Sequence, residues 1–124
     1  MGILEHTNLT VSDPDVTAAW LCDVFDWKVR WRGDALNGGL SVHVGSQDSY
    51  LAIYNPRKTL ADAPSSYEVV GGLNHIGIAV DDLDAIERKV KVQGFETHSH
   101  ADYEPGRRFY FCDNDGIEFE VVQY

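Results

Sequence analysis

Two histidines stand at matching places in the sequence, and they are the first residues able to do chemistry. His6 lies in the segment Leu4–Asp13 and His75 in the segment Leu73–Asp82, and the two segments share Leu, His, Val and Asp in the same order and spacing. This similarity indicates an internal repeat, which places both imidazoles at equivalent positions. Imidazole nitrogens bind metal ions and exchange protons near neutral pH.

A carboxylate near the end of the chain adds an oxygen donor. Alternate side chains of a strand point to opposite faces, and in the last expected strand Phe119 and Val121 take the apolar face. Glu120 therefore lies on the open face, as His6 and His75 do in their own strands. The set predicts a divalent-metal site; the alternative is a hydrogen-bonded cluster in which the carboxylate balances the histidines.

The elements that must position these side chains follow the order strand, helix and three strands, twice over. Asp13 is the expected N-cap of the first helix, and Asp81 or Asp82 that of the second. The apolar helix faces are expected to comprise Val16, Ala19, Trp20 and Val24, and Leu83, Ile86, Val90 and Val92. Further strands are expected at residues 28–32, 40–44 and 50–54, and at residues 96–100, 107–112 and 117–123.

The chain length favours one domain. The 124 residues match a common domain size, and half of them with a single helix could hardly bury both faces of a sheet. We expect a single α+β domain over 1–124, with a first module at about 3–55, a linker at 56–72 that contains Pro and Gly, and a second module at about 73–124.

The charge balance restricts the partners. Ten Lys and Arg against twenty Asp and Glu give a net charge of -10, which disfavours nucleic acid and anionic membranes. No apolar run reaches the roughly 18 residues of a membrane span, and no basic segment followed by an apolar core opens the chain. We expect a cytoplasmic protein that binds a small molecule.

Further residues of the first module face the same side by strand parity. His43 is a candidate acid or base. Tyr50 and Tyr54 flank the small Ala52 and could line a cleft for a flat ligand. His98 and His100 alternate with Ser99, a pattern of a surface metal site that is more often incidental.

The repeat and the closing motif Asp-Asn-Asp-Gly-Ile-Glu-Phe-Glu, residues 113–120, resemble the vicinal oxygen chelate superfamily over essentially the whole chain. This superfamily includes glyoxalase I, bleomycin resistance proteins, extradiol dioxygenases and fosfomycin resistance enzymes. The resemblance implies two βαβββ modules forming a curved mixed sheet. It also implies a homodimer, in which modules of two chains often build each cleft.

The resemblance also assigns ligands. The metal ligands of the family fall on His6, His75 and Glu120, whereas Ala52 stands where glyoxalase I has a Glu. Two imidazoles and one carboxylate resemble the three-ligand site of extradiol dioxygenases and fosfomycin enzymes. They suit Fe²⁺ or Mn²⁺, with Ni²⁺ or Zn²⁺ as further possibilities.

Three more residues acquire roles from the resemblance. Tyr110 stands where both three-ligand families have a substrate-facing tyrosine; the alternative is an amphipathic core residue. Asn8 replaces a substrate-binding Thr of the fosfomycin enzymes. Arg108 could bind a substrate carboxylate or phosphate, or be a solvated charge.

Two functions remain open at this point. The first is a metal-dependent enzyme of dioxygenase, lyase or transferase type acting on a substrate with neighbouring oxygens. The second is a metal-free drug- or metabolite-binding protein, as bleomycin resistance proteins are. Convergence of His6, His75 and Glu120 favours the enzyme, and a pairing of Glu120 with Arg108 favours the binding protein.

Overall fold

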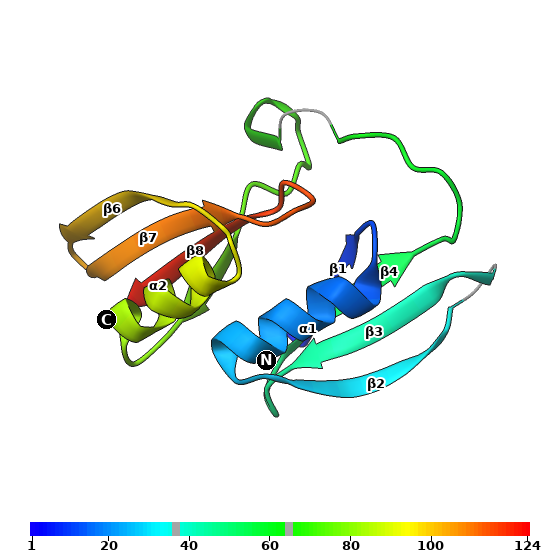
Figure 1. Cartoon of the computed structure of the whole chain (residues 1–124), viewed down its shortest axis with the longest axis horizontal. Helices are drawn as coiled ribbons and strands as arrows, with labels where there is room; N and C mark the ends of the chain where they lie inside the picture. Colours follow the sequence, from blue (N-terminus) through cyan, green and yellow to red (C-terminus); the bar gives the residue numbers. More distant parts are fainter. Residues whose placement is uncertain (36–37, 64–65) are drawn as a thin grey trace. The chain divides into compact units, whose positions relative to one another are not determined.

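The computed structural model describes residues 1–35, 38–63 and 66–124. The chain divides into two compact units, Met1–Leu60 and Ala61–Tyr124 (Figure 1). Each unit has the order strand, helix and three strands, so the predicted repeat of two βαβββ modules is confirmed.

The first unit is a four-stranded mixed sheet with one covering helix. The strands lie in the order β1-β4-β3-β2, with β1 parallel to β4 and the other neighbours antiparallel. The elements are β1 (His6–Thr10), α1 (Pro14–Phe25), β2 (Lys28–Asp34), β3 (Leu40–Gly45) and β4 (Tyr50–Asn55).

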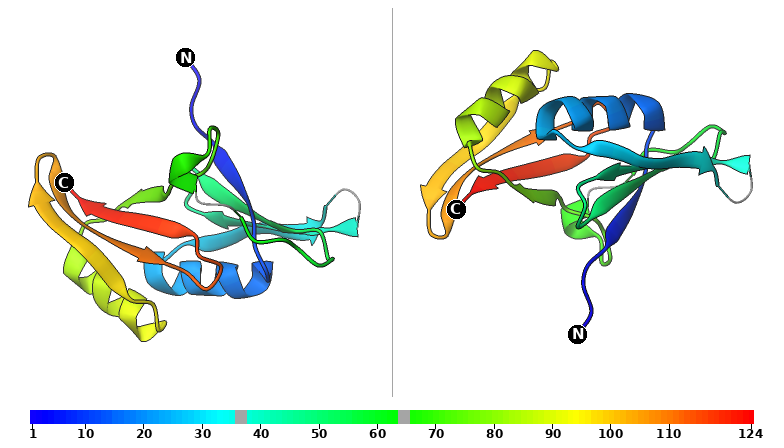
Figure 2. Two further views of the ribbon diagram at one scale, coloured as in Figure 1. Left: turned by 90° about the horizontal axis from the view of Figure 1, so that it is seen from above. Right: turned by 90° about the horizontal axis from the view of Figure 1, so that it is seen from below.

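The second unit repeats this topology with the order β5-β8-β7-β6 and one parallel pair, β5 with β8. In the views of Figure 2, as in Figure 1, each helix lies against one face of its own sheet and leaves the other face open. The elements are the short 3-10 helix η2 (Ser66–Glu68), β5 (Ile76–Ala79), α2 (Leu83–Val92), β6 (Thr97–Tyr103), β7 (Gly106–Cys112) and β8 (Glu118–Gln123). Helix η2 lies in the predicted linker, of which residues 64 and 65 are outside the described residues.

Both helices begin at the predicted type of cap. The Asp13 carboxylate accepts hydrogen bonds from the N–H groups of Asp15 and Val16 at 3.1 and 3.3 Å. Asp82, rather than Asp81, caps α2 by accepting from the Ala85 N–H at 3.0 Å. An acidic cap satisfies amide groups that have no partner within the helix.

The buried face of α1 differs from the predicted one by one position. Thr17 and Ala18 are buried, whereas Val16 and Ala19 are exposed. Leu21 is fully buried and lies at the centre of the apolar stripe, and residues three and four positions before it share its side of the helix. In α2 the predicted Val92 is also exposed, because it lies about 200° around the helix from the buried Val90.

The strand faces follow the predicted alternation. Phe109, Phe111, Phe119 and Val121 are fully buried on the helix side of the second sheet. The turn before β8 is fixed by Asp113, whose carboxylate accepts from the N–H groups of Asp115 and Ile117. Gly116 has a φ of 78°, a conformation that glycine adopts without strain. This turn sets which residues of β8 reach the open face.

Candidate functional site

The open face of the second sheet gathers three of the predicted site residues. Glu120 on β8 accepts a hydrogen bond from Arg108 Nη1 at 2.7 Å through Oε1. Its other oxygen, Oε2, lies 3.0 Å from His75 Nε2. The Glu120 and Arg108 side chains are each only 12% exposed, so this cluster is largely shielded from water. Glu120 therefore contacts both His75 and Arg108, and the Arg108 pairing is the one that favours the binding protein.

Arg108 is held from several sides. Its guanidinium lies 4.7 Å from the ring centre of Tyr103 and donates to the carbonyl of Gly106 at 3.3 Å. Its Nε–H is buried and has no acceptor among the described residues. The arginine is thus fixed in place beside Glu120 with one unused donor.

A tyrosine that sequence analysis missed holds the other side of His75. The Tyr67 hydroxyl, on η2, lies 3.1 Å from His75 Nδ1 and donates to Glu118 Oε1 at 2.9 Å. Burial of the hydroxyl and the Glu118 carboxylate raise the pKa of Tyr67 to about 12, so the phenol stays protonated at neutral pH. Strand parity placed Glu118 on this face, but nothing in the local sequence points to Tyr67.

Tyr110 lies on β7 directly opposite Glu120 in the strand pairing. Its ring meets that of His75 edge-on, with ring centres 5.6 Å apart. Burial and the negative charge of Glu120 raise the pKa of Tyr110, so its hydroxyl is a proton donor at neutral pH. Tyr110 therefore lies beside His75 and Glu120 on the open face of the second sheet.

The open face of the first sheet carries a row of rings. The ring centre of Tyr50 lies 5.0 Å from that of His6 and 4.6 Å from that of His43, and Trp31 lies 5.0 Å from His43. The Arg30 guanidinium lies 4.5 Å from the Tyr50 ring centre. Burial, followed by the charges of His6 and Arg30, lowers the pKa of His43. The row is thus an aromatic surface beside the Arg30 guanidinium, in which His43 is less readily protonated than a free imidazole.

The remaining predicted residues of the first unit lie near this row. Asn8 is exposed on β1 and pairs in register with the buried Ala52. Tyr54 is half-buried two positions further along β4, in contact with Gly39. His6 also forms a 2.8 Å contact with Glu5 through Nδ1. Within either unit, no three described His, Cys, Asp or Glu side chains form a group that could hold a metal ion.

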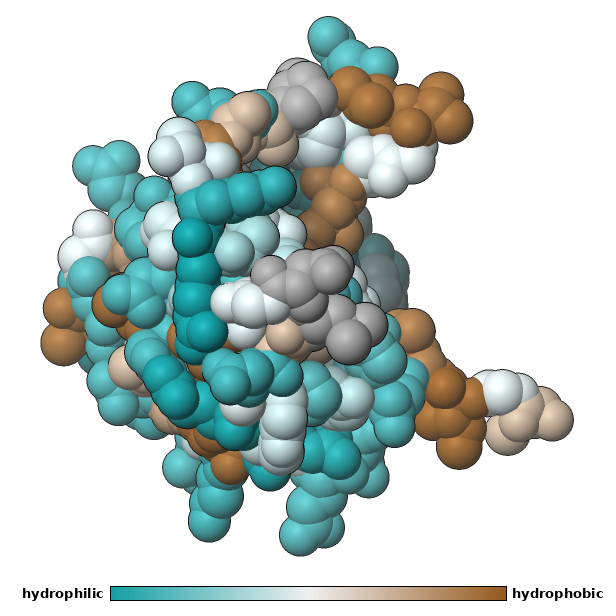
Figure 3. All heavy atoms as spheres, turned by 90° about the vertical axis from the view of Figure 1, so that its right-hand side faces the viewer, coloured by the Kyte–Doolittle hydropathy of each residue, from teal (hydrophilic) through white to brown (hydrophobic). Residues whose placement is uncertain are grey.

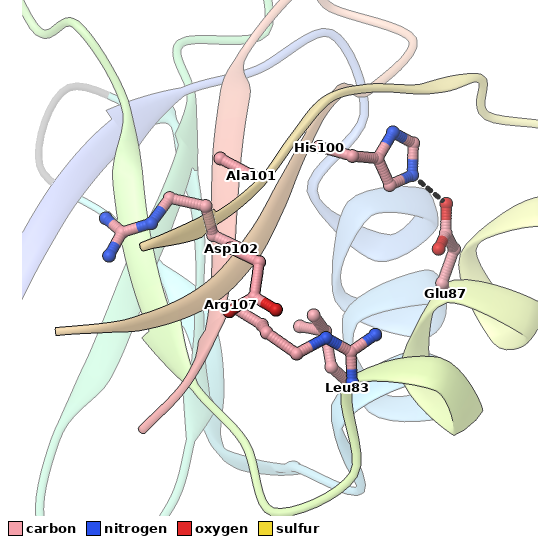
Figure 4. Close-up of a pocket in the computed structure, with 7 residues that line it drawn as sticks. Leu83, Glu87, His100, Ala101, Asp102 and Arg107 are labelled. Carbon is pink, nitrogen blue, oxygen red and sulfur yellow. Dashed lines mark hydrogen bonds and ion pairs between the residues drawn. The ribbon is translucent and has the colours of Figure 1, made fainter. Parts of the chain in front are cut away.

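A pocket with a volume of about 250 Å³ lies elsewhere in the second unit, between α2 and the strands β6 and β7 (Figure 4). On its wall, His100 Nε2 and a carboxylate oxygen of Glu87 are 2.6 Å apart. Thr97 also donates to Glu87, and Arg107 pairs with Asp84 at 2.9 Å. The contacts of Glu87 and Arg107 therefore tie helix α2 to the strands beside this pocket.

The surface agrees with the acidic composition. The side drawn in Figure 3 is mostly hydrophilic, with apolar residues at its margins. Among the described residues, no helix has the length and apolar character needed to span a membrane.

Comparison with known proteins identifies a family. The family model described as "Glyoxalase/Bleomycin resistance protein/Dioxygenase superfamily" matches residues 3–121. No curated protein sequence matches the chain closely enough to show a relationship.

Several solved structures share the fold at low sequence identity. A glyoxylase/bleomycin resistance protein/dioxygenase domain from Frankia sp. EAN1pec has a TM-score of 0.84 and 22% identity, over 99% of this chain and 98% of that one. The antibiotic binding protein TnmS3 from Streptomyces sp. CB03234 has a TM-score of 0.75 and 16% identity, over 99% and 96%. A mutant of the fosfomycin resistance protein FosX from Listeria monocytogenes, complexed with Mn(II) and 1S,2S-dihydroxypropylphosphonic acid, has a TM-score of 0.74 and 20% identity, over 98% and 92%.

Proposed function

The chain belongs to the glyoxalase/bleomycin resistance protein/dioxygenase superfamily, and from this premise we propose that it is a metal-dependent enzyme. Its substrate is a small molecule with two neighbouring oxygen atoms, and its reaction is of dioxygenase, lyase or transferase type. The proposal rests on the pairing of His75 with Glu120 on the open face of the second sheet.

The donor atoms of this pair fit a divalent ion. Two ligand atoms at right angles, each about 2.1 Å from an ion, are about 3.0 Å apart. The measured separation of His75 Nε2 and Glu120 Oε2 is 3.0 Å. Arg108 contacts the carboxylate through Oε1, so ligation through Oε2 would leave this contact in place. We propose His6 as the third ligand, as the family pattern assigns.

The identity of the ion follows from the donor set. Two imidazole nitrogens and one carboxylate oxygen suit Fe²⁺ or Mn²⁺, and a FosX neighbour is complexed with Mn(II). A bound ion would stabilise negative charge on the substrate oxygens. Tyr110 would donate a hydrogen bond to one of these oxygens, and Arg108 would orient Glu120.

The aromatic row supports the substrate class. Partly accessible rings at close spacing bind flat ligands by stacking, and the half-buried Tyr50 and His43 form such a surface. We propose that Tyr50, Tyr54 and Asn8 bind the substrate and that His43 serves as an acid or base.

We also propose that the chain acts as a homodimer, which light scattering tests directly.

The experiment that tests the metal proposal is equilibrium dialysis against Mn(II) and, without oxygen, Fe(II). The wild-type chain is expected to take up close to one ion. His75→Ala and Glu120→Gln are expected to weaken binding more than about 100-fold, because each removes a ligand. His98→Ala is the matched control, since this histidine is exposed on the same sheet and lies outside the pair. No uptake by the wild-type chain, or equal uptake by Glu120→Gln, contradicts the proposal.

A second candidate function is metal-free binding of an anionic aromatic molecule. It is favoured by the Arg108 pairing with Glu120 at 2.7 Å and by the unused Nε–H of the same arginine. Titration with aromatic carboxylates in the presence of a chelator separates the two functions. Binding that persists with the chelator and is lost in Arg108→Gln supports the second; binding that requires Mn(II) supports the first.

A further inference from the structure

The contacts of Tyr67 determine the direction of two hydrogen bonds. A phenol has one proton to donate, and an ionised carboxylate can only accept. The Tyr67 hydroxyl lies 2.9 Å from Glu118 Oε1 and 3.1 Å from His75 Nδ1. Because Tyr67 donates its hydrogen bond to Glu118, its oxygen accepts a hydrogen bond from His75 Nδ1–H.

The opposite direction is unfavourable. If Tyr67 donated to Nδ1, its oxygen and the Glu118 carboxylate would face each other at 2.9 Å without a proton between them. Two such acceptors in contact repel.

We propose that Tyr67 is a positioning residue that, with Glu118, keeps the proton of His75 on Nδ1 and directs Nε2 toward Glu120. The chain of contacts runs from Glu118 through Tyr67 and His75 to Glu120. In this chain His75 Nε2 lies 3.0 Å from Glu120 Oε2. Because both atoms carry lone pairs, a cation is needed between them. This assignment rests on the proposed function, in which that cation is a metal ion. It gives η2, a helix of the connecting segment, a role in the site.

Tyr67 can be substituted without disturbing the core. The Tyr67 side chain is on a three-residue helix and the residue is 57% exposed, so Tyr67→Phe removes the hydroxyl without opening the core. Tyr124→Phe is the matched control, because Tyr124 is 77% exposed at the end of the chain. In Glu118→Gln the new amide can donate to the phenol oxygen, which allows Tyr67 to turn its proton toward Nδ1.

The experiment measures the proton directly, by long-range proton–nitrogen correlation spectra of the histidine rings with and without Zn(II). The His75 signals are assigned by their loss in His75→Gln. Wild type is expected to carry a proton on Nδ1 in both states, protected from exchange. Tyr67→Phe is expected to remove this protection and to weaken Zn(II) binding about 10- to 100-fold, Glu118→Gln to reduce the protonation of Nδ1, and Tyr124→Phe to change neither.

Two results overturn the assignment: an Nδ1 without a proton in wild type, or a Tyr67→Phe protein that behaves like Tyr124→Phe in both measurements. Failure of the metal proposal would give a different result in the same experiment. A wild-type protein that takes up no Zn(II), yet shows a Tyr67-dependent Nδ1 proton, contradicts the metal site and supports the role of Tyr67.

Discussion

At the place in the second sheet where β8 carries Glu120, the first sheet carries Ala52 on β4. Ala52 pairs in register with Asn8 and His43, and Glu120 pairs with Gly77 and Tyr110. The buried alanine is 3% exposed and its neighbours form the aromatic row. The carboxylate is instead surrounded by charged and hydrogen-bonding groups. The same backbone register thus supports two different chemistries on the open faces.

The covering helices differ as well. Helix α1 buries six residues, whereas α2 buries two, Leu83 and Val90. The polar contacts of Glu87 with Thr97 and His100 add to the attachment of α2. The first module therefore relies mainly on apolar packing of its helix, and the second relies in part on hydrogen bonds.

The largest expected loss in the free energy of unfolding comes from substitutions in the core. Leu21→Ala on α1 is expected to lower the free energy of unfolding by about 4 kcal/mol, because the side chain is fully buried and leaves a cavity. Leu83→Ala on α2 is expected to cost only about 2 kcal/mol, because Leu83 already lines a pocket. Urea denaturation followed by circular dichroism measures both. Equal losses of unfolding free energy would contradict the inferred difference between the two helices.

The next effect concerns the equivalent positions of the two sheets. Ala52→Glu is expected to destabilise the chain by about 2 kcal/mol at neutral pH, because the buried site would take the new carboxylate out of water. Ala52→Gln controls for size. Thermal or urea unfolding should show a greater loss of stability for Ala52→Glu than for Ala52→Gln. Equal losses of stability would contradict the difference that we infer between the open faces of the two sheets.

A smaller effect tests the polar attachment of α2. Burial raises the pKa of Glu87, but the hydrogen bonds from Thr97 and His100 outweigh it and lower the pKa. A lowered carboxyl pKa stabilises the fold above the ordinary pKa, and this stability is lost as the pH falls through the lowered value. Glu87→Gln is therefore expected to cost about 1 kcal/mol at pH about 7 and progressively less in acid. Glu96→Gln, an exposed control, should show no such trend; a loss that is independent of pH contradicts this account.

The smallest effect is spectroscopic and tests the aromatic row. Because the pKa of His43 is lowered, Trp31 beside it should be quenched by a charged imidazole only below pH about 6.5. Fluorescence titration measures the midpoint, with Trp31→Phe subtracted as background and His43→Asn expected to remove the transition. A midpoint at or above the ordinary value would mean that the row carries charge near neutral pH.

Strand-based predictions succeed here because the two-residue period of a strand is strict. Parity alone assigned Glu120 to the open face, and β8 pairs with β5 as β4 pairs with β1, which places Ala52 and Glu120 at equivalent positions of the two sheets. The helix face was wrong by one position because several alignments of a 3.6-residue period fit the same apolar residues. Val16 and Thr17 are adjacent, and only packing against the sheet decides which is buried.

Contacts between distant segments were the least predictable. Tyr67 reaches His75 and Glu118 from a segment with no regular pattern, and its role depends on the path of the chain. The Arg108 pairing was foreseen as an alternative to ligation by Glu120. Local sequence could not show that the two oxygens of one carboxylate serve both His75 and Arg108.

Locating the ion is the most direct test of the central claim. Crystals grown with Mn(II) and measured for anomalous scattering should show a peak about 2.2 Å from both His75 Nε2 and Glu120 Oε2, with Arg108 still bound to Oε1. A peak at Glu87 and His100 instead, or no peak while Mn(II) is in excess, would contradict a metal centre on the open face of the second sheet.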